Sequence, residues 1–430
     1  MNRLLICTVI VAIVTAALWT NFTQASVPDP ISEWGSVAQT AVAAGGMPPL
    51  RTPITFAILH LAMYDAVNAV TGHREPFAVA PPVTRPASAF AAAVEAGYRV
   101  LLAEVPSQQP ALDAKYAQLS AAIPDSQEKM NGAAVGADVA RQLLLRRAND
   151  GRNLNIPYVP GSGAGHWIAT PPAFLPATTA FLGRISPFTM EAPWQFRPNG
   201  PPPLHSSQWA RDYDEVKKLG AKNSVERTAG QTATALFWEP LAGTVWPATI
   251  RRLTREQGLD LASSAHFQAT AFAAFADGLI ACWDAKFAFN FWRPVTAIQR
   301  GETDGNDLTA ADPDWEPLAV TPNFPEYPSG HACATAAVAH VIEDYFSHDV
   351  VIPARNIVSG EERFYRKASD VVDEVIEARM LLGLHFRSAD EEGADIGRKV
   401  ARQIRSRWFK GARSQAGEGA RSAGEGGPTK

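Results

Sequence analysis

The sequence predicts a mainly α-helical protein in which helical bundles are joined by long loops rich in proline and glycine. Apolar residues recur at helical spacing over 31–70, 86–104 and 109–148, whereas the alternation typical of strands is rare. Of the 430 residues, 46% are hydrophobic and 19% are charged, so the chain can bury a large core and is not disordered as a whole. Gly and Pro crowd residues 151–206, which predicts a long irregular connection.

This connection also carries Trp and Phe side chains, so we expect it to pack against the helices. It ends an N-terminal helical half, residues 26–206, and a C-terminal helical half follows over 207–410. The apolar spacing in the second half predicts helices over 207–220, 226–239, 256–292, 330–346, 360–382 and 389–409.

The first 25 residues are typical of a secretory signal peptide. Arg3 supplies a positive charge, residues 4–18 form an apolar run, and Thr23 and Ala25 are the small residues of a cleavage site. The run is shorter than the roughly 20 apolar residues that a membrane helix needs. We therefore expect an exported protein, periplasmic or secreted, without a membrane span once the signal is removed; an uncleaved anchor is the alternative.

Composition and residue spacing predict a disordered tail and free thiols, and they argue against nucleic acid binding and a zinc site. The tail, 411–430, lacks periodicity and is expected to be disordered. Removal of the signal leaves Cys282 and Cys333, which we expect to be buried thiols rather than a disulfide. A formal net charge of −4 gives no basic field for duplex nucleic acid. Neither His-Glu-x-x-His nor paired-cysteine spacing, as zinc sites require, occurs in the sequence.

Candidate chemistry begins with Lys286 and Arg293. Seven residues apart on one helix, they would lie about 700° apart, or on nearly the same face. Pro294 disfavours helical backbone at Arg293, so the two cations are expected to converge near a helix end. Alone, such a pair is most often a solvated surface. The aromatic residues between them are not a surface composition: Phe287, Phe289, Phe291 and Trp292.

The second segment contains Ser329, Gly330 and His331, directly before an apolar helical run. It predicts a helix N-terminus, whose free backbone N–H groups favour an anion. Ser329 adds a hydroxyl, Gly330 permits close approach of a ligand, and His331 is a candidate acid and base. An ordinary N-cap is the alternative for this segment alone.

The third segment contains Arg379 and His385. Gly383 is typical of a helix C-terminus, which places Arg379 in the last turn and His385 just beyond it. A satisfied core histidine is the alternative for His385 alone. Together the three segments supply three cations, a helix N-terminus and two histidines. These groups can hold an oxyanion, with one histidine bonded to its central atom and the other moving protons.

The order and spacing of Lys286-x6-Arg293-Pro294, Pro328-Ser329-Gly330-His331 and Arg379-x5-His385 resemble the three-part signature of vanadium-dependent haloperoxidases and type-2 phosphatidic acid phosphatases. Further stretches resemble the bacterial exported haloperoxidases and extend the similarity over most of 31–409. These stretches are Leu61 to Ala69, Gly165 to Pro172, Phe237-Trp238 and Trp246.

The resemblance implies the mainly α fold of these enzymes and one prosthetic vanadate, whose site phosphate can also occupy. It implies that His385 coordinates vanadium, that His331 is the acid and base, and that Lys286 polarises bound peroxide. The residues implied to bind the vanadate oxygens are Lys286, Arg293, Ser329, Gly330 and Arg379. Hydrogen peroxide would oxidise a halide to hypohalous acid, which reacts with a small organic acceptor. Family members often form dimers or larger assemblies, so a homo-oligomer is expected.

Trp283, Pro322 and Phe324 resemble a hydrophobic halide pocket of the chloride-oxidising members, which favours bromide or chloride as the halide. The family often has an aspartate four residues after the last histidine, whereas Asp390 stands one residue later, so it is not assigned to orient His385. For a carboxylate partner of His331, Asp212 and Asp214 are the candidates.

Three functions therefore compete. The first is a vanadate-dependent haloperoxidase. The second is an acid phosphatase with the same pocket, in which His385 forms a phosphohistidine and His331 protonates the leaving group. The third is a non-catalytic anion-binding protein.

Overall fold

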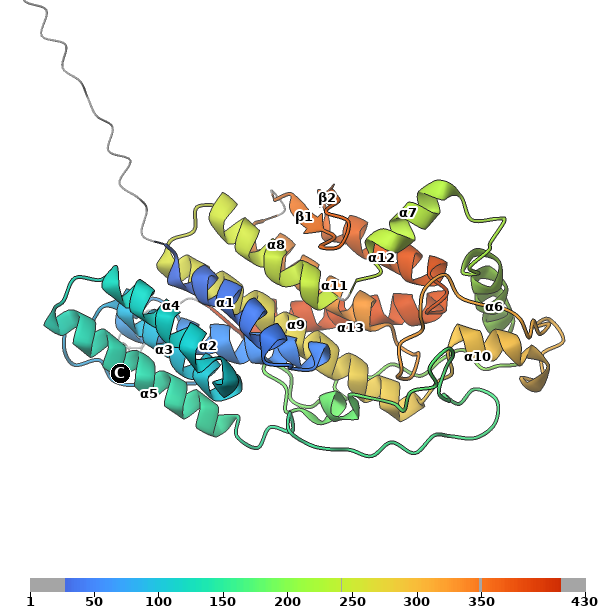
Figure 1. Ribbon diagram of the computed structural model, residues 1–430, viewed down its shortest axis with the longest axis horizontal. Coiled ribbons are helices and arrows are strands. Elements are labelled where there is room, and N and C mark those ends of the chain that lie inside the picture. The colour runs from blue at the N-terminus through green and yellow to red at the C-terminus, as the bar shows by residue number, and fades with distance from the viewer. Residues whose placement is uncertain (1–27, 241, 348–349, 411–430) are drawn as a thin grey trace, which may run out of the picture.

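The computed structural model describes residues 28–240, 242–347 and 350–410, and it confirms the mainly α fold. Thirteen α-helices and one two-stranded antiparallel hairpin run through these residues (Figure 1). The predicted signal peptide, 1–25, and the predicted disordered tail, 411–430, lie outside the described residues.

The N-terminal helices pack around one buried helix, α2. These helices are α1 (Pro30–Ala44), α2 (Thr52–Thr71), α3 (Ala89–Glu104), α4 (Gln109–Ala121) and α5 (Gln127–Arg146). Within the described residues, one segment, Pro49–Thr71, is long and apolar enough to cross a membrane, but 83% of its most apolar window is buried inside the protein. Because most of it is buried, this segment is a core helix of the fold.

The connection between the halves is irregular and packed, as the sequence predicts. Apart from a short 3-10 turn at Ala180–Arg184, residues 147–206 form no regular element. Asp277 lies at 0% exposure in α9 and anchors this connection. Its carboxylate accepts the backbone N–H of Phe188 at 2.8 Å and that of Thr189 at 2.6 Å. These bonds hold the connection against the central helix.

The C-terminal half contains eight helices and the hairpin. Its helices are α6 (Ser207–Leu219), α7 (Ala229–Phe237), α8 (Ala242–Glu256), α9 (Leu261–Phe289), α10 (Pro294–Gln299), α11 (Gly330–Tyr345), α12 (Ala368–Leu381) and α13 (Arg387–Arg407). The strands are β1 (Ile352–Arg355) and β2 (Glu362–Tyr365), paired in antiparallel register.

Four sequence-based expectations differ from these bounds. The helix expected over 31–70 is broken near Gly45 and Gly46, and the one over 109–148 is broken after Ala121. The start of the helix expected over 360–382 is instead strand β2. Helix α8 was not expected, because Pro247 interrupts its pattern.

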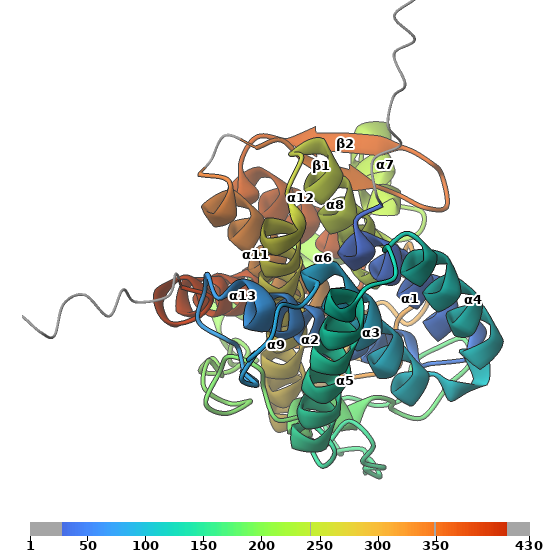
Figure 2. The same ribbon diagram turned by 90° about the vertical axis from the view of Figure 1, so that its left-hand side faces the viewer.

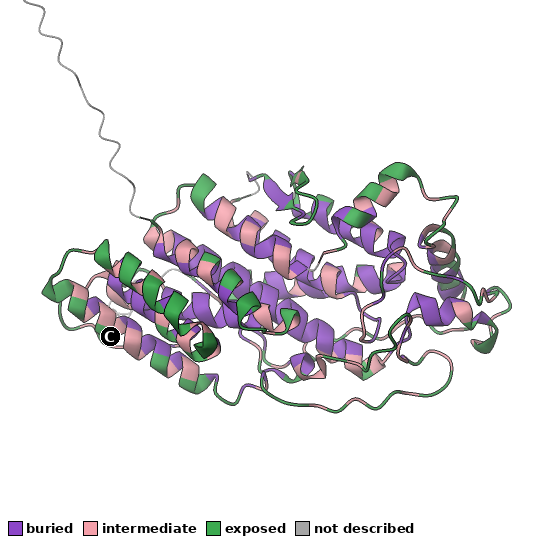
Figure 3. Ribbon diagram, in the orientation of Figure 1, coloured by how far each residue is buried: buried purple, intermediate pink, exposed green. Residues whose placement is uncertain are grey.

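Helix α9 is the element that the two halves share. It spans 29 residues and is buried from Ser264 to Ala281 without interruption (Figure 3). It contacts α2 of the N-terminal half and α11 and α13 of the C-terminal half (Figures 1 and 2). A helix that is covered all round is apolar all round, which explains why α9 shows little amphipathic patterning.

Two glycines allow α13 to approach α11 closely. A β-carbon at Gly397 would lie 2.4 Å from the carbonyl oxygen of Cys333, and one at Gly393 would lie 2.5 Å from that of Ser329. Both contacts are with backbone, which cannot rotate away. The backbone of Ser329 is also fixed by its N–H bond to the Ala389 carbonyl at 2.9 Å. The start of α11 is therefore positioned by α13.

We expect Gly397→Ala to lower the free energy of unfolding by about 1–3 kcal/mol, because the added methyl group overpacks a backbone contact. Urea denaturation measures this change. Gly230→Ala is the matched control: a β-carbon there would meet only Thr228 Oγ1, at 3.9 Å, so stability should stay equal or rise. Equal stability of both variants would contradict the close approach.

Candidate active site

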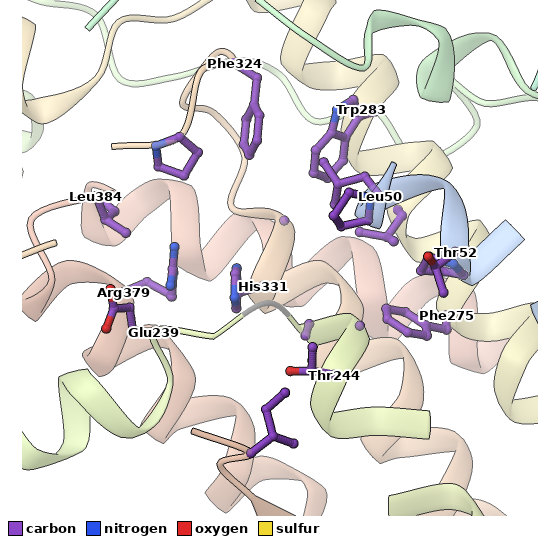
Figure 4. A pocket seen from close by; sticks show the side chains of 18 of the residues that line it. Leu50, Thr52, Glu239, Thr244, Phe275, Trp283, Phe324, His331, Arg379 and Leu384 are labelled. Atoms are coloured by element: carbon purple, nitrogen blue, oxygen red, sulfur yellow. The ribbon is translucent and has the colours of Figure 1, made fainter. Parts of the chain in front are cut away.

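The structure brings the three predicted segments together at the inner end of one cavity. Nη1 of Arg293 lies 3.2 Å from Nε2 of His385, although 92 residues separate them in the chain. The predicted site residues that line this cavity are Trp283, Pro322, Phe324, Gly330, His331, Arg379 and His385 (Figure 4). Lys286, Arg293 and Ser329 are fully buried beside them.

Lys286 and Arg293 converge, but the expectation of one continuous helix face is wrong. Helix α9 ends at Phe289, and Asn290 follows in the left-handed region with φ 52°. Asparagine tolerates this conformation better than most residues. Arg293 then has extended backbone before Pro294, as that proline requires. Helix α9 therefore ends between the two cations, and Arg293 stands at the start of α10.

Lys286 is engaged by the loop before α11. Its Nζ donates to the carbonyl oxygens of Pro325 at 3.2 Å, Glu326 at 2.8 Å and Pro328. An ammonium has three protons, so these carbonyls occupy all of its donors. Lys286 thus fixes the loop and places a buried positive charge behind it.

Arg293 spans the loop and the segment after α12. Its Nε donates to the Phe324 carbonyl at 3.0 Å, and Nη1 donates to the Leu384 carbonyl at 2.8 Å. Nη2 is buried without a hydrogen-bond partner. This arginine therefore keeps one donor for a ligand.

The second segment begins α11, as expected. Ser329 is its N-cap, yet the serine hydroxyl makes no capping bond and has no hydrogen-bond partner. A β-carbon at Gly330 would lie 2.8 Å from the Trp283 ring, so only glycine fits there. Nε2 of His331 lies 3.1 Å from the carbonyl oxygen of Pro240, which can only accept. Nε2 therefore carries the proton, and Nδ1 of a neutral ring has the lone pair.

In the third segment, Gly383 follows the C-terminus of α12 in the left-handed region, with φ 73°, as its C-terminal position predicts. Arg379 lies in the last turn of α12, where Nη1 donates to the Trp238 carbonyl at 3.2 Å and Nε has no partner. His385 follows beyond the helix and is 2% exposed.

Glu326, which no sequence motif singled out, orients His385. Oε1 of Glu326 lies 2.8 Å from Nδ1 of His385 and accepts the Phe386 N–H at 3.1 Å. With Nδ1 as donor, Nε2 of His385 presents its lone pair toward Arg293. One signal in the sequence pointed to Glu326: it is an acidic residue in a stretch rich in Pro and aromatic residues. A charged residue in such a stretch is buried only when it has partners.

The other candidate carboxylates lie elsewhere. Asp390 is buried beside Ser329 and Arg379 rather than on His385. Asp212 faces Ser388, and Asp214 pairs with Lys218 at 2.6 Å on the surface of α6. The suggestion that Asp212 or Asp214 partners His331 is therefore wrong; the Pro240 carbonyl takes that place.

The predicted halide pocket is assembled from distant segments. The ring centroids of Trp283 and Phe324 lie 5.2 Å apart, and the Lys286 ammonium lies 5.4 Å from each ring. Pro322 lines the same part of the cavity. A small anion there would meet aromatic edges with a buried cation behind them.

Burial controls the titration of the charged groups. It lowers the pKa of Lys286 to about 8, of Arg293 to about 9 and of Arg379 to about 10. Burial also raises the pKa of Glu326 to about 8, although Lys286 and Arg293 act in the opposite direction. Burial, and then the neighbouring arginines, lowers the pKa of His385. The histidine is therefore neutral and can act as a ligand.

The unpartnered groups fit a tetrahedral oxyanion. Arg293 Nη2, Arg379 Nε and Ser329 Oγ are buried polar atoms without protein partners, a rare condition in native structures. All three can donate to anionic oxygens, and the helix N-terminus at Gly330 adds backbone N–H groups. In the described part of the chain, no group of three or more His, Cys, Asp or Glu side chains could hold a bare metal ion.

Part of the C-terminal half is similar to a known family model and to a known enzyme. Residues 266–411 match the family model described as the VCPO second helical-bundle domain. Over 177 residues the chain is 31% identical to vanadium chloroperoxidase of Curvularia inaequalis, which is 34% of this chain and 29% of that protein. The chain thus matches less than a third of the length of this curated relative. The matched family region contains every predicted oxyanion ligand.

The fold similarity extends further. The chain resembles a bacterial vanadium-dependent iodoperoxidase with a TM-score of 0.76 at 22% identity, over 90% of this chain and 98% of that one. It resembles the holo form of a bacterial vanadium-dependent chloroperoxidase with a TM-score of 0.64 at 18% identity, over 84% of this chain and 92% of that one. The chain therefore has the fold of these bacterial vanadium-dependent enzymes.

We expect Glu326→Ala to weaken binding of inorganic phosphate by about 10–100-fold, because His385 loses the group that fixes its ring and tautomer. Glu326→Gln retains an acceptor oxygen and should lose less. Isothermal titration calorimetry measures both affinities.

Glu302→Ala, at an exposed position, is the matched control and should bind phosphate as the wild type does. Circular dichroism confirms that each variant is folded. Wild-type affinity in the folded Glu326→Ala variant would contradict the orienting role.

Proposed function

We propose that the protein is a vanadate-dependent haloperoxidase that oxidises bromide or chloride with hydrogen peroxide to hypohalous acid. The observation that carries this proposal is the set of buried, unpartnered donors around a neutral histidine whose Nε2 lone pair is fixed. The relatives named as vanadium chloroperoxidase and vanadium-dependent iodoperoxidase support the choice of oxyanion.

Vanadate fits this donor set, and His385 Nε2 would bind the vanadium. Arg293 Nη2, Arg379 Nε, Ser329 Oγ and the backbone at Gly330 would hold its oxygens. The chemistry that bound vanadate supplies is activation of hydrogen peroxide toward a halide, without a change in oxidation state. Lys286 contributes a buried positive charge that strengthens this activation.

His331 is placed to move protons at the cavity surface. Nε2–H is held by the Pro240 carbonyl, so Nδ1 is the atom of a neutral ring that can take a proton from peroxide or return one to a leaving oxygen. Burial, and then Arg379, lowers the pKa of His331, which keeps the ring neutral and ready to accept. Trp283 and Phe324 exclude water from the inner end.

A phosphatase is the second candidate, because the same fixed Nε2 lone pair can attack phosphorus as well as bind vanadium. His385 would form the phosphohistidine as the ester oxygen leaves with a proton from His331. Trapping of a labelled phosphoenzyme that disappears in His385→Ala would support this candidate. Absence of trapped phosphate and of aryl phosphate turnover would argue against it.

Two finer points belong to the proposal. Export rests on the N-terminal residues, whose features are those of a signal peptide. The preference for bromide or chloride rests on the aromatic pocket at Trp283 and Phe324, and assays with each halide decide it.

We expect purified protein loaded with orthovanadate to brominate or chlorinate a phenol with peroxide. His331→Ala should lower kcat by about 10²–10⁴-fold, because the proton acceptor is lost. His73→Ala, at an exposed position, is the matched control and should keep the wild-type rate. Full activity after chelation and dialysis without vanadate would refute the proposed function.

A further inference from the structure

One edge of the β1–β2 hairpin is open. The hairpin lies at the surface of the C-terminal half, with α8 beside β1 (Figures 1 and 2). The Asn356 N–H donates to the Glu361 carbonyl at 3.0 Å, and such bonded pairs alternate along an antiparallel ladder. Alternate residues of β2 therefore direct their backbone groups toward β1, whereas Glu362 and Phe364 direct theirs away from it.

The two edges of this hairpin differ in how their backbone groups are satisfied. On β1, the Pro353 carbonyl accepts the Thr249 hydroxyl at 2.7 Å, and a proline has no N–H to offer. On β2, no described residue bonds to the outward N–H and C=O groups of Glu362 and Phe364. The Phe364 residue is also 56% exposed. An uncovered strand edge of this kind is a template for pairing with another chain.

The sequence around β2 carries opposite charges at its two ends. Glu361 and Glu362 stand before Phe364, and Arg366 and Lys367 stand after it, all of them exposed. The backbone at Lys367 is still extended, with φ −135° and ψ 148°. If a second copy of this segment runs antiparallel with Phe364 at the centre, Glu362 lies opposite the partner subunit's Arg366. Glu361 then lies opposite the partner subunit's Lys367, so the segment is complementary to itself.

The charges favour this register over shifted ones. A shift of two residues in one direction would place Arg363 opposite the partner subunit's Arg363, and a shift in the other direction would place it opposite the partner subunit's Lys367. Like charges that lie directly opposite are destabilising. Within the described residues, Arg366 and Lys367 have no ion-pair partner. Glu362 has only a partly exposed one, Arg252 at 3.2 Å, and such a pair exchanges at little cost.

We propose that β2 pairs with β2 of a second copy of this chain, and that the two hairpins form one four-stranded antiparallel sheet. The two-fold axis passes beside Phe364, so its N–H donates to the carbonyl of the partner subunit's Phe364, and the reverse bond closes the pair. The two phenyl rings lie on the same face of the sheet, where cross-strand aromatic pairs are stabilising. A single strand pair buries less surface than a standard interface, so we expect a dissociation constant in the micromolar range. This inference does not rest on the proposed function.

The first test is sedimentation velocity of the purified protein over a range of concentrations. We expect a monomer–dimer equilibrium that Glu362→Arg weakens by about tenfold or more, because each ion pair with Arg366 across the axis becomes a repulsion. Arg366→Glu should have the same effect. The double variant Glu362→Arg/Arg366→Glu exchanges the two charges and should restore the wild-type affinity.

Glu302→Arg makes the same charge reversal at an exposed position outside the hairpin and should dimerise as the wild type does. Circular dichroism checks the fold of each variant. A wild type that stays monomeric at millimolar concentration overturns the proposal. A dimer whose affinity is unchanged in the folded single variants, or a double variant that is no tighter than the single ones, also overturns it.

The second test locates the axis by disulfide cross-linking. In this register Phe364 is the residue of β2 that lies opposite its own copy, at a Cα–Cα distance of about 5.5 Å, which a disulfide can span. We expect Phe364→Cys to form a covalent dimer under mild oxidation, seen by non-reducing electrophoresis. Glu362→Cys, on the same open edge, is the matched control and should not cross-link. The native Cys282 and Cys333 are buried and should not compete. Equal cross-linking of the two variants, or none in Phe364→Cys, overturns the proposal.

Discussion

Burial of three cations around one neutral histidine is the constraint on which the rest of the structure depends. Lys286, Arg293 and Arg379 are no more than 2% exposed. Removal of a charge from water is costly unless partners compensate. Backbone carbonyls accept the donors of the lysine and part of those of each arginine. The carboxyl groups of Glu326 and Asp390 lie nearby, but burial raises the pKa of both. An anion at the unpartnered donors would compensate the remaining charge, so the buried cations favour an oxyanion as ligand.

The loop before α11 positions the charged groups of the site relative to one another. Its carbonyls hold Lys286 and Arg293, its Glu326 orients His385, and its last residue begins the helix whose N-terminus faces the site. Helix α13 fixes the end of this loop through glycine contacts on α11. A short segment thus connects α9, α11 and the residues after α12, which explains why groups distant in sequence meet within hydrogen-bond distance.

The sequence could predict the helices, the irregular connection and the residues of the three segments, because each leaves a local signal such as periodicity, Pro-Gly crowding or a helix start. It could not predict that α9 ends at Asn290, between Lys286 and Arg293, nor that Glu326 meets His385. Those contacts depend on tertiary packing. Asp212 and Asp214 were plausible partners of His331 because their side chains can accept a hydrogen bond. The partner is instead the backbone carbonyl of Pro240, and because every residue has a carbonyl, residue type could not reveal it.

The apolar end of the cavity bears on the choice between halide oxidation and phosphoester hydrolysis. Both reactions use a cluster of buried cations and a histidine whose Nε2 lone pair is fixed, so the inner end cannot distinguish them. A phosphomonoester also has a leaving group, which must enter the cavity together with the phosphate dianion. An apolar wall suits this leaving group only when the group is itself apolar. Trp283 and Phe324 instead surround the space beside the Lys286 charge with aromatic rings. A monovalent halide costs less to desolvate there than a phosphate dianion does, and the low dielectric strengthens the effect of the cation on peroxide. The aromatic end of the cavity therefore favours halide oxidation.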